Sequence, residues 1–186
     1  LNHHGHIALM KTESIDFFQA KPLKYLISKD EQDKILTFIK NDPELNSAIE
    51  WSSGYLSGMG LIQVENKSTP FMALGVEPKA YGDAMNHPYL KEWANDWVQN
   101  KYGSDFREME KNNQLVSITA KMSLLLGLKT PFTSAQNTPL EAQLIGQNYF
   151  HDLNALSEEL GPIHSTGLSM LDESSIILPL SKLQEL

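Results

Sequence analysis

The chain has 186 residues and no cysteine, which excludes disulfides, thiolate metal sites and cysteine nucleophiles. Its residues are 41% hydrophobic and 20% charged, the profile of a globular protein with its own core. The net charge of −8 argues against a general nucleic-acid binder, which needs a basic footprint. The sequence also has no run of about 18 apolar residues, the length that spans a bilayer.

The first quarter of the chain predicts one strand followed by one helix. His6–Lys11 alternates loosely between apolar and polar residues, which favours a strand. Ser28 and Glu31 have the spacing of a capping box, and apolar residues recur behind them at helical spacing. Pro43 is expected to end this helix.

Two apolar runs around a short polar turn predict a β-hairpin next. Leu61–Glu65 and Phe71–Val76 lie on either side of Asn66–Ser68. Glycines in and before the first run predict a bulge or a mobile crossing rather than flat pairing: Gly54, Gly58 and Gly60.

Helical patterns dominate the middle of the chain. Tyr89–Asn100 is expected to be a helix, and Asp105–Lys111 a charged, exposed segment. Thr119–Leu126 predicts an apolar helix ended by Gly127, and Lys129–Pro139 has the composition of a linker.

The last part of the chain predicts three strands and a closing helix. Glu141–Gln147 and Leu153–Ile163 are expected to be strands joined by a short turn. Ser175–Leu178 is apolar and β-branched, as in a buried strand. The proline after it ends the strand and opens the helix Leu180–Leu186.

Strands at both chain ends and helices between them predict an α+β fold of two lobes. Neither terminal portion has enough strands to close a sheet alone. Residues 1–79 and 142–186 are therefore expected to form one discontinuous β-α-β lobe. Residues 80–141 are then an inserted, helix-rich second lobe.

Four segments carry short motifs: Gly5–Leu9 with Gly-His-Ile, Ala73–Pro78 with Gly-Val-x-Pro, Thr119–Leu128 with Leu-Gly-Leu, and Gly161–Leu186 with Thr-Gly-Leu, Asp and Pro-Leu. In this order they resemble the extracytoplasmic domain of MacB-like or FtsX-like ABC transporter permeases. One departure is Asn113–Thr119, which lacks the glycine that commonly precedes the Leu-Gly-Leu helix.

The resemblance implies a membrane-proximal porter lobe and an inserted sabre lobe. It implies a location on the extracytoplasmic side of the bacterial inner membrane, between two membrane helices that flank this chain. Such a domain is not itself an enzyme, binds no cofactor and transmits conformational change across the membrane. The implied partners are an ABC ATPase, a second permease copy or homologue, and a periplasmic adaptor or carrier.

The resemblance leaves the substrate open among lipoproteins, lipid-linked molecules, peptides and drugs. Lipoprotein-releasing members of the family carry an extended hairpin that contacts a periplasmic carrier. The matching hairpin here, Gln147–Leu153, is short. Its length favours an efflux or general permease role over lipoprotein release.

No motif identifies a catalytic or metal-binding residue. The terminal histidines lack a nearby carboxylate and are expected to belong to a flexible terminus: His3, His4 and His6. Two pairs could suggest a hydrolase triad: His151-Asp152 and His164-Ser165. The sequence has no Gly-x-Ser-x-Gly elbow to supply the nucleophilic serine. The clustered carboxylates alternate with basic residues, as on a solvated helix face: Glu92, Asp105, Glu108 and Glu110.

Four residues are the candidates for partner contacts. Tyr55 and Met59 lie in a Gly/Ser-rich stretch without clear periodicity, whereas the helical spacing of the tryptophans at 93 and 97 favours core packing. Phe150 and His151 lie on the hairpin tip. The alternative hypothesis is a free-standing secreted or cytosolic hydrolase that uses His and Asp.

Overall fold

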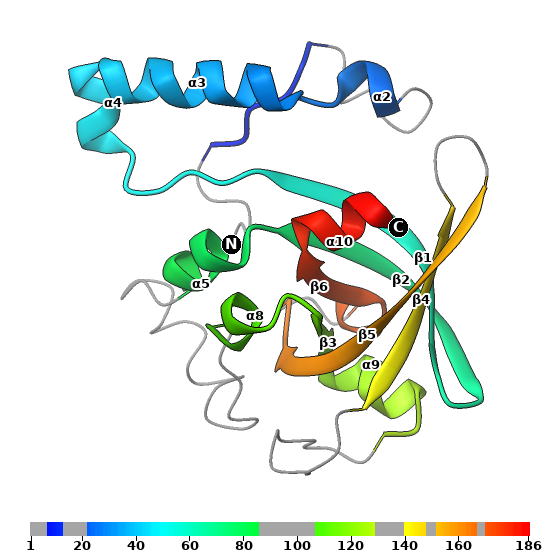
Figure 1. The fold of residues 1–186 in the computed structure, drawn as a ribbon. Coiled ribbons are helices and arrows are strands. Elements are labelled where there is room, and N and C mark those ends of the chain that lie inside the picture. Colours follow the sequence, from blue (N-terminus) through cyan, green and yellow to red (C-terminus); the bar gives the residue numbers. More distant parts are fainter. Residues whose placement is uncertain (1–6, 13–21, 86–106, 129–139, 148–151, 167–169) are drawn as a thin grey trace. The chain divides into compact units, whose positions relative to one another are not determined.

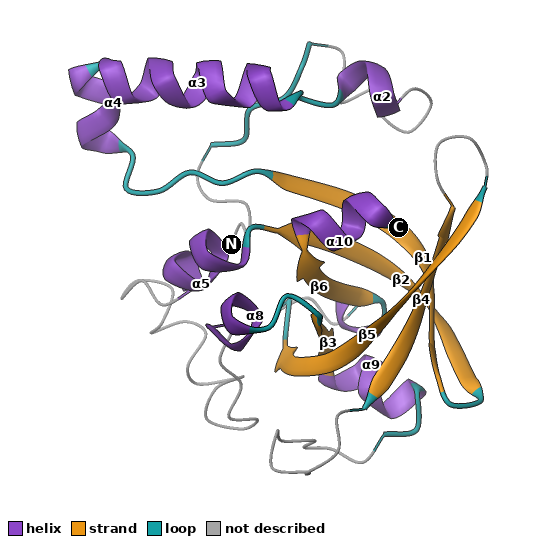
Figure 2. Cartoon of the chain, in the orientation of Figure 1, coloured by secondary structure: helices purple, strands orange, loops and turns teal. Residues whose placement is uncertain are grey.

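The computed structural model describes residues 7–12, 22–85, 107–128, 140–147, 152–166 and 170–186. The chain forms two compact units, Leu1–Ser52 and Ser53–Leu186. The described elements of the first unit are helices, and those of the second are mixed α and β (Figures 1 and 2).

The first unit contains α2 (Pro22–Tyr25), α3 (Lys29–Asn41) and α4 (Pro43–Ala48). The predicted capping box at the start of α3 is confirmed. The Glu31 backbone N–H donates to Ser28 Oγ at 3.3 Å, and the Ser28 N–H donates to Glu31 Oε2 at 2.7 Å. This second bond, to the ionised carboxyl, lowers the pKa of Glu31 to about 2.

The strand expected over His6–Lys11 is wrong for the part that the structure describes, since Ile7–Lys11 forms no strand. An alternating pattern becomes a strand only where a neighbouring strand offers a hydrogen-bond ladder. The described elements of this unit are helical, so they offer none. Lys11 instead forms an ion pair with Glu31, at 2.9 Å between Nζ and Oε2.

The second unit is built on a closed six-stranded barrel with the strand order β1-β2-β6-β3-β5-β4. Its strands are β1 (Tyr55–Val64), β2 (Lys67–Val76), β3 (Leu115–Thr119), β4 (Glu141–Gln147), β5 (Leu153–His164) and β6 (Ser175–Pro179). The pairs β2–β6 and β3–β5 are parallel and the other ladders are antiparallel. The described helices are α5 (Pro78–Met85), α8 (Arg107–Lys111), α9 (Ala120–Leu125), α10 (Leu180–Glu185) and the 3-10 turn η2 (Leu171–Glu173).

Most of the elements predicted in this unit are confirmed. The hairpin, the two strands after residue 140, the apolar helix before Gly127 and the final strand and helix all form where they were expected. The Tyr89–Asn100 helix lies outside the described residues. The division into porter and sabre lobes stays a prediction.

Strand β3 was missed because its five residues lie directly before the apolar helix and look like the approach to it. β3 pairs with β5 and β6. The expectation that Asp105–Lys111 is an exposed charged segment is wrong at Met109. That side chain is buried with Tyr81 and Ile177, since even one apolar residue in a charged segment gains by leaving water.

The barrel interior is apolar and continuous. Inward-facing side chains of all six strands join one cluster, with additional side chains from α9 and α10: Ile62, Val64, Phe71, Ala73, Val116, Ile118, Met122, Leu126, Ala142, Leu144, Leu160, Ile176, Leu178, Leu183 and Leu186. Gly60 faces Phe71 across the β1–β2 ladder, and the Phe71 ring fills the space above the glycine.

The first prediction concerns this glycine. A Cβ at position 60 would collide with the Ile145 carbonyl oxygen and lie 2.9 Å from the Phe71 ring. Because backbone cannot swing away as a side chain does, Gly60→Ala should lower the free energy of unfolding by about 1–3 kcal/mol. Urea denaturation measures this. Ser57→Ala, at an exposed position on the same strand, is the control and should change stability by less than about 0.5 kcal/mol.

Candidate functional site: the seat of the C-terminal helix

The last helix, α10, enters the barrel core although it has only six residues. Pro179 ends β6, and the chain turns directly into the helix. Leu183 and Leu186 are both buried and belong to the main core cluster. Figure 1 shows the helix lying across β1 and β2, next to β6, which it follows in the chain. The end of the described chain therefore covers one end of the barrel interior.

Three glycines on three strands make room for α10. A Cβ at Gly58 of β1 would lie 2.8 Å from Leu183 Cδ1, and one at Gly75 of β2 would lie 3.0 Å from Leu183 Cβ. A Cβ at Gly146 of β4 would lie 2.6 Å from Leu186 Cγ. We call Gly58, Gly75 and Gly146 the glycine seat.

The glycine seat corrects the prediction of a bulge around Gly58. β1 pairs with β2 over its whole length without a shift in register. The glycines are present because the helix approaches the sheet closely, which is the other common reason for glycine inside a strand.

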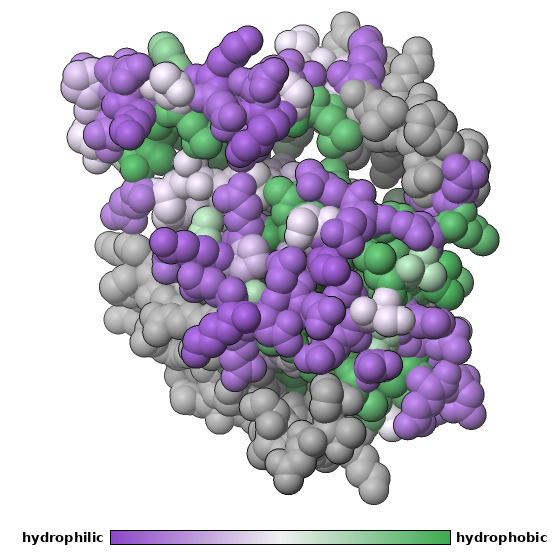
Figure 3. All heavy atoms as spheres, viewed as in Figure 1, coloured by the Kyte–Doolittle hydropathy of each residue, from purple (hydrophilic) through white to green (hydrophobic). Residues whose placement is uncertain are grey.

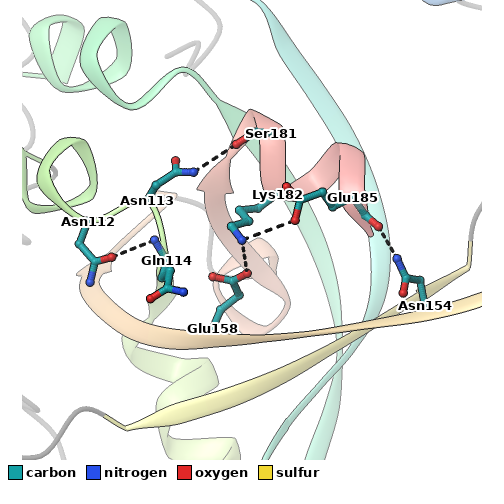
Figure 4. Close-up of polar contacts among 8 residues, drawn as sticks. All are labelled: Asn112, Asn113, Gln114, Asn154, Glu158, Ser181, Lys182 and Glu185. Atoms are coloured by element: carbon teal, nitrogen blue, oxygen red, sulfur yellow. Dashed lines mark hydrogen bonds and ion pairs between the residues drawn. The ribbon is translucent and has the colours of Figure 1, made fainter.

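Polar side chains from two neighbouring segments hold the helix in the seat (Figure 4). Asn113, in the turn before β3, donates from Nδ2 to Ser181 Oγ at 3.3 Å. Asn154, at the start of β5, donates from Nδ2 to the Glu185 carbonyl oxygen, one of the backbone acceptors that a helix end leaves open. The helix is thus bound at both ends.

A charged residue lies among the apolar side chains that face α10. Glu158 occupies an inward position of β5 and is 2% exposed. Its Oε1 lies 3.2 Å from Nζ of Lys182 on α10, whose side chain is 19% exposed. Lys182 also reaches Glu185, at 3.5 Å from Oε2. Glu158 Oε2 has no hydrogen-bond partner in the part of the chain that the structure describes.

Burial raises the pKa of Glu158, because removal from water disfavours the ionised carboxyl more than Lys182 stabilises it. The pKa of Lys182 is also raised, chiefly by its hydrogen bond to Glu158. Lys182 loses less hydration than Glu158. The ion pair therefore raises the pKa of the lysine by more than burial lowers it. The carboxylate is therefore the energetically costly member of the pair.

A second polar cluster organises the segment that precedes β6. Asp172 Oδ1 accepts from the Thr166 backbone N–H and hydroxyl, both at 2.7 Å, and Oδ2 accepts from Ser165 Oγ at 3.1 Å. The Asp172 carbonyl accepts from Thr119 Oγ1, and the same hydroxyl oxygen accepts from the Met122 N–H at 3.1 Å. One threonine thus caps α9 and holds the closing segment.

His164 and Ser117 form a buried polar contact rather than an accessible nucleophile. Ser117 Oγ donates its one proton to the Pro162 carbonyl oxygen at 2.6 Å. His164 Nδ1 lies 2.9 Å from Ser117 Oγ and therefore donates to this hydroxyl oxygen. His164 Nε2 lies 3.2 Å from Ser175 Oγ. Ser117 is fully buried, so a substrate has no access to its hydroxyl. The contact joins β3, β5 and β6.

The candidate partner-contact residues on β1 are exposed. Tyr55 is 38% and Met59 68% exposed, and Met59 lies opposite the exposed Met72 of β2. Figure 3 shows hydrophobic residues at the surface in the region that β1 and β4 occupy in Figure 1. The other two candidates, Phe150 and His151, lie outside the described residues. What any of these residues binds stays a prediction.

The remaining sequence candidates contribute no site within the described ranges. Glu110 is exposed and Glu108 partly so, and both belong to the short helix α8. The other acidic, histidine and tryptophan candidates lie outside the described residues: His3, His4, His6, Glu92, Trp93, Trp97 and Asp105. Among the described side chains, no three His, Asp or Glu groups lie close enough together to hold a metal ion.

Sequence reasoning missed the residues around α10. One signal was available for Glu158, because it interrupts the apolar alternation of Leu156 and Leu160 on β5. Nothing local marked Asn113, Asn154 or Lys182, whose partners lie on other elements.

No helix in the described ranges combines the length and apolar character needed to cross a membrane. No family model matches the sequence, and no curated protein matches it. Among solved structures, the chain is similar to the extracellular domain of the noncanonic ABC-type transporter YknZ from Gram-positive bacteria. The identity is 12% and the TM-score 0.46, over 81% of this chain and 63% of that one. The match thus spans less than two thirds of that domain.

The second prediction concerns Asp172. Its carboxylate accepts three hydrogen bonds that Asp172→Ala removes. The free energy of unfolding should fall by about 1–3 kcal/mol, because the Thr166 donors lose their acceptor. Thermal and urea denaturation measure the change. The neighbouring Glu173→Ala removes an exposed ion pair with Lys121 and should change stability by less than about 1 kcal/mol. Equal losses in both variants would contradict the role assigned to Asp172.

Proposed function

We propose that this chain is the extracytoplasmic domain of an ABC transporter permease of the MacB-like or FtsX-like kind. One observation carries the proposal: three of the segments that resemble this family, far apart in the sequence, are in direct contact in the second unit. The resemblance thus coincides with a spatial cluster of interacting residues and not only with an order along the chain.

The first contact joins the Gly-Val-x-Pro segment to the closing segment. Gly75 and Val76 at the end of β2 pair in parallel with Leu178 and Pro179 of β6. Gly75 also lies under α10, the helix that begins with the Pro-Leu motif. This pairing supports the proposal because the residues of one motif position those of the other: the β2 end pairs with β6, and Gly75 leaves room for α10.

The second contact joins the Leu-Gly-Leu helix to the same closing segment. Thr119 caps that helix and donates to Asp172, which binds Thr166 of the Thr-Gly-Leu motif. Gly127 ends the helix with φ of +72°, a backbone conformation that favours glycine. A structural requirement thus accounts for Thr119, Gly127, Thr166 and Asp172.

In the proposed function, the domain lies on the outer side of the cytoplasmic membrane and contacts a partner or substrate. A separate ATPase hydrolyses ATP on the other side of the membrane. Movement passes between the two sides through the segments that enter and leave this domain, and α10 is the described element at the exit. Export, efflux and lipoprotein release are all compatible with this arrangement.

The gene itself tests the proposal. We expect codons for about 20 predominantly apolar residues shortly after the codon for Leu186. We expect a second such stretch shortly before the codon for Leu1, because each membrane helix needs this length. DNA sequencing on both sides of this segment is the measurement. A stop codon directly after Leu186 would refute the assignment.

The fourth prediction concerns association. We expect the isolated chain to be monomeric at micromolar concentration although the full permease works as a pair. Its net charge of −8 gives repulsion between copies, and membrane helices that raise the local concentration are missing. Sedimentation velocity across a concentration series measures this. A tight dimer that survives the double variant Tyr55→Ala with Met59→Ala would contradict both the weak association and the choice of surface.

A further inference from the structure

The ion pair under α10 is asymmetric. Lys182 also pairs with Glu185 and its side chain is 19% exposed, so it keeps part of its hydration in the seated helix. Glu158 is almost fully buried and has Lys182 as its ion-pair partner, while Oε2 is left without a hydrogen bond in the described part of the chain. A buried carboxylate with one unsatisfied oxygen is costly when it is ionised. The cost ends when the helix leaves and water reaches the carboxylate.

Few described contacts hold the helix that covers Glu158. α10 contributes two buried leucines to the core and is held by single hydrogen bonds at its two ends. Release of α10 from the seat takes Leu183 and Leu186 out of the core and breaks both of these hydrogen bonds. The backbone amides around the two leucines then lose the packing that shields them from water.

We propose that α10 is a reversible plug of the barrel and that the charge on Glu158 sets how firmly it is held. An uncharged Glu158 favours the seated helix, and an ionised one favours its release. Lys182 limits this effect because its ammonium lies 3.2 Å from the carboxylate and compensates part of the charge. The pair thus keeps the seated and released states of α10 close in free energy. This balance is a property of the isolated chain and does not depend on the proposed function.

The direction of the pH dependence follows from the groups that face Glu158. These are Lys182 and Glu185 of α10 and Glu159 of its own strand. Burial raises the pKa of Glu158, Lys182 opposes that rise, and the two neighbouring carboxylates add to it. The seated state therefore binds the proton more tightly than the released state, so seating strengthens as pH falls and weakens as pH rises through the raised pKa.

Hydrogen exchange of the Leu183–Leu186 amides tests the proposal, with rates divided by those of an unstructured peptide of the same sequence. At about pH 7, Lys182→Met should accelerate exchange roughly tenfold or more, since it leaves the buried charge without compensation. Acidification to about pH 4.5 should restore protection. Glu158→Gln keeps the size but carries no charge, so its α10 amides should be at least as protected as in the wild type and should respond to pH less than those of the wild type over this range.

The double variant Glu158→Gln with Lys182→Met removes both charges. It should be as protected as Glu158→Gln alone, even if Lys182→Met by itself does not fold. Lys121→Met, which breaks the exposed pair with Glu173, is the matched control and should leave α10 exchange unchanged. The Val116–Ile118 amides of β3 report on the barrel and should change little in the variants that fold.

Two results would overturn the proposal. In the first, Glu158→Gln accelerates α10 exchange as much as Lys182→Met does, which would make the ion pair a clamp that the helix needs. In the second, the β3 amides accelerate together with those of α10, which would make the helix an inseparable part of the barrel. Neither result bears on the permease assignment, which the gene test decides independently.

Discussion

The second unit depends on the close approach of α10 to strands β1, β2 and β4. Leucine side chains from the end of the chain complete a core that the strands alone leave open, and they reach it because Gly58, Gly75 and Gly146 carry no side chain. In a close-packed interior a single methyl group is enough to block such an approach. The barrel end and the final helix are therefore specified together, by residues on four separate elements.

Glu158, under this helix, is a charged side chain in a core that is otherwise apolar. The other inward positions near it on β5 are apolar, and a third apolar residue at position 158 would pack there without a partner's help. Replacing a buried ion pair by hydrophobic residues is often neutral or stabilising in proteins. The presence of Glu158 and Lys182 is thus better explained by the reversibility that they give to α10 than by a gain in stability.

On the other side of β6, hydrogen bonds from hydroxyl and carboxylate groups hold the segments together, whereas at the glycine seat the leucine side chains do so. Thr119, Thr166 and Asp172 join the start of α9 to the segment before β6, and Ser117, His164 and Ser175 join three strands. The bonds from Ser117 to His164 and from Thr119 to Asp172 join residues far apart in the sequence, so they fix the segment before β6 against β3 and β5. β6 and α10 are therefore anchored before the chain reaches the glycine seat.

The amino-acid sequence by itself determined the elements whose signals are local. The capping box of α3, the glycine that ends α9, the hairpin strands β4 and β5 and the Pro179 junction all rest on residues within a few positions of one another. Only the tertiary structure decided the rest. It showed that Ile7–Lys11 forms no strand, that Leu115–Thr119 joins the barrel, that the glycines admit a helix, and that Glu158 meets Lys182. A strand needs a ladder partner, a glycine in a strand needs a neighbour that comes close, and a buried charge needs a counter-charge; in this chain each of these partners lies on a distant segment.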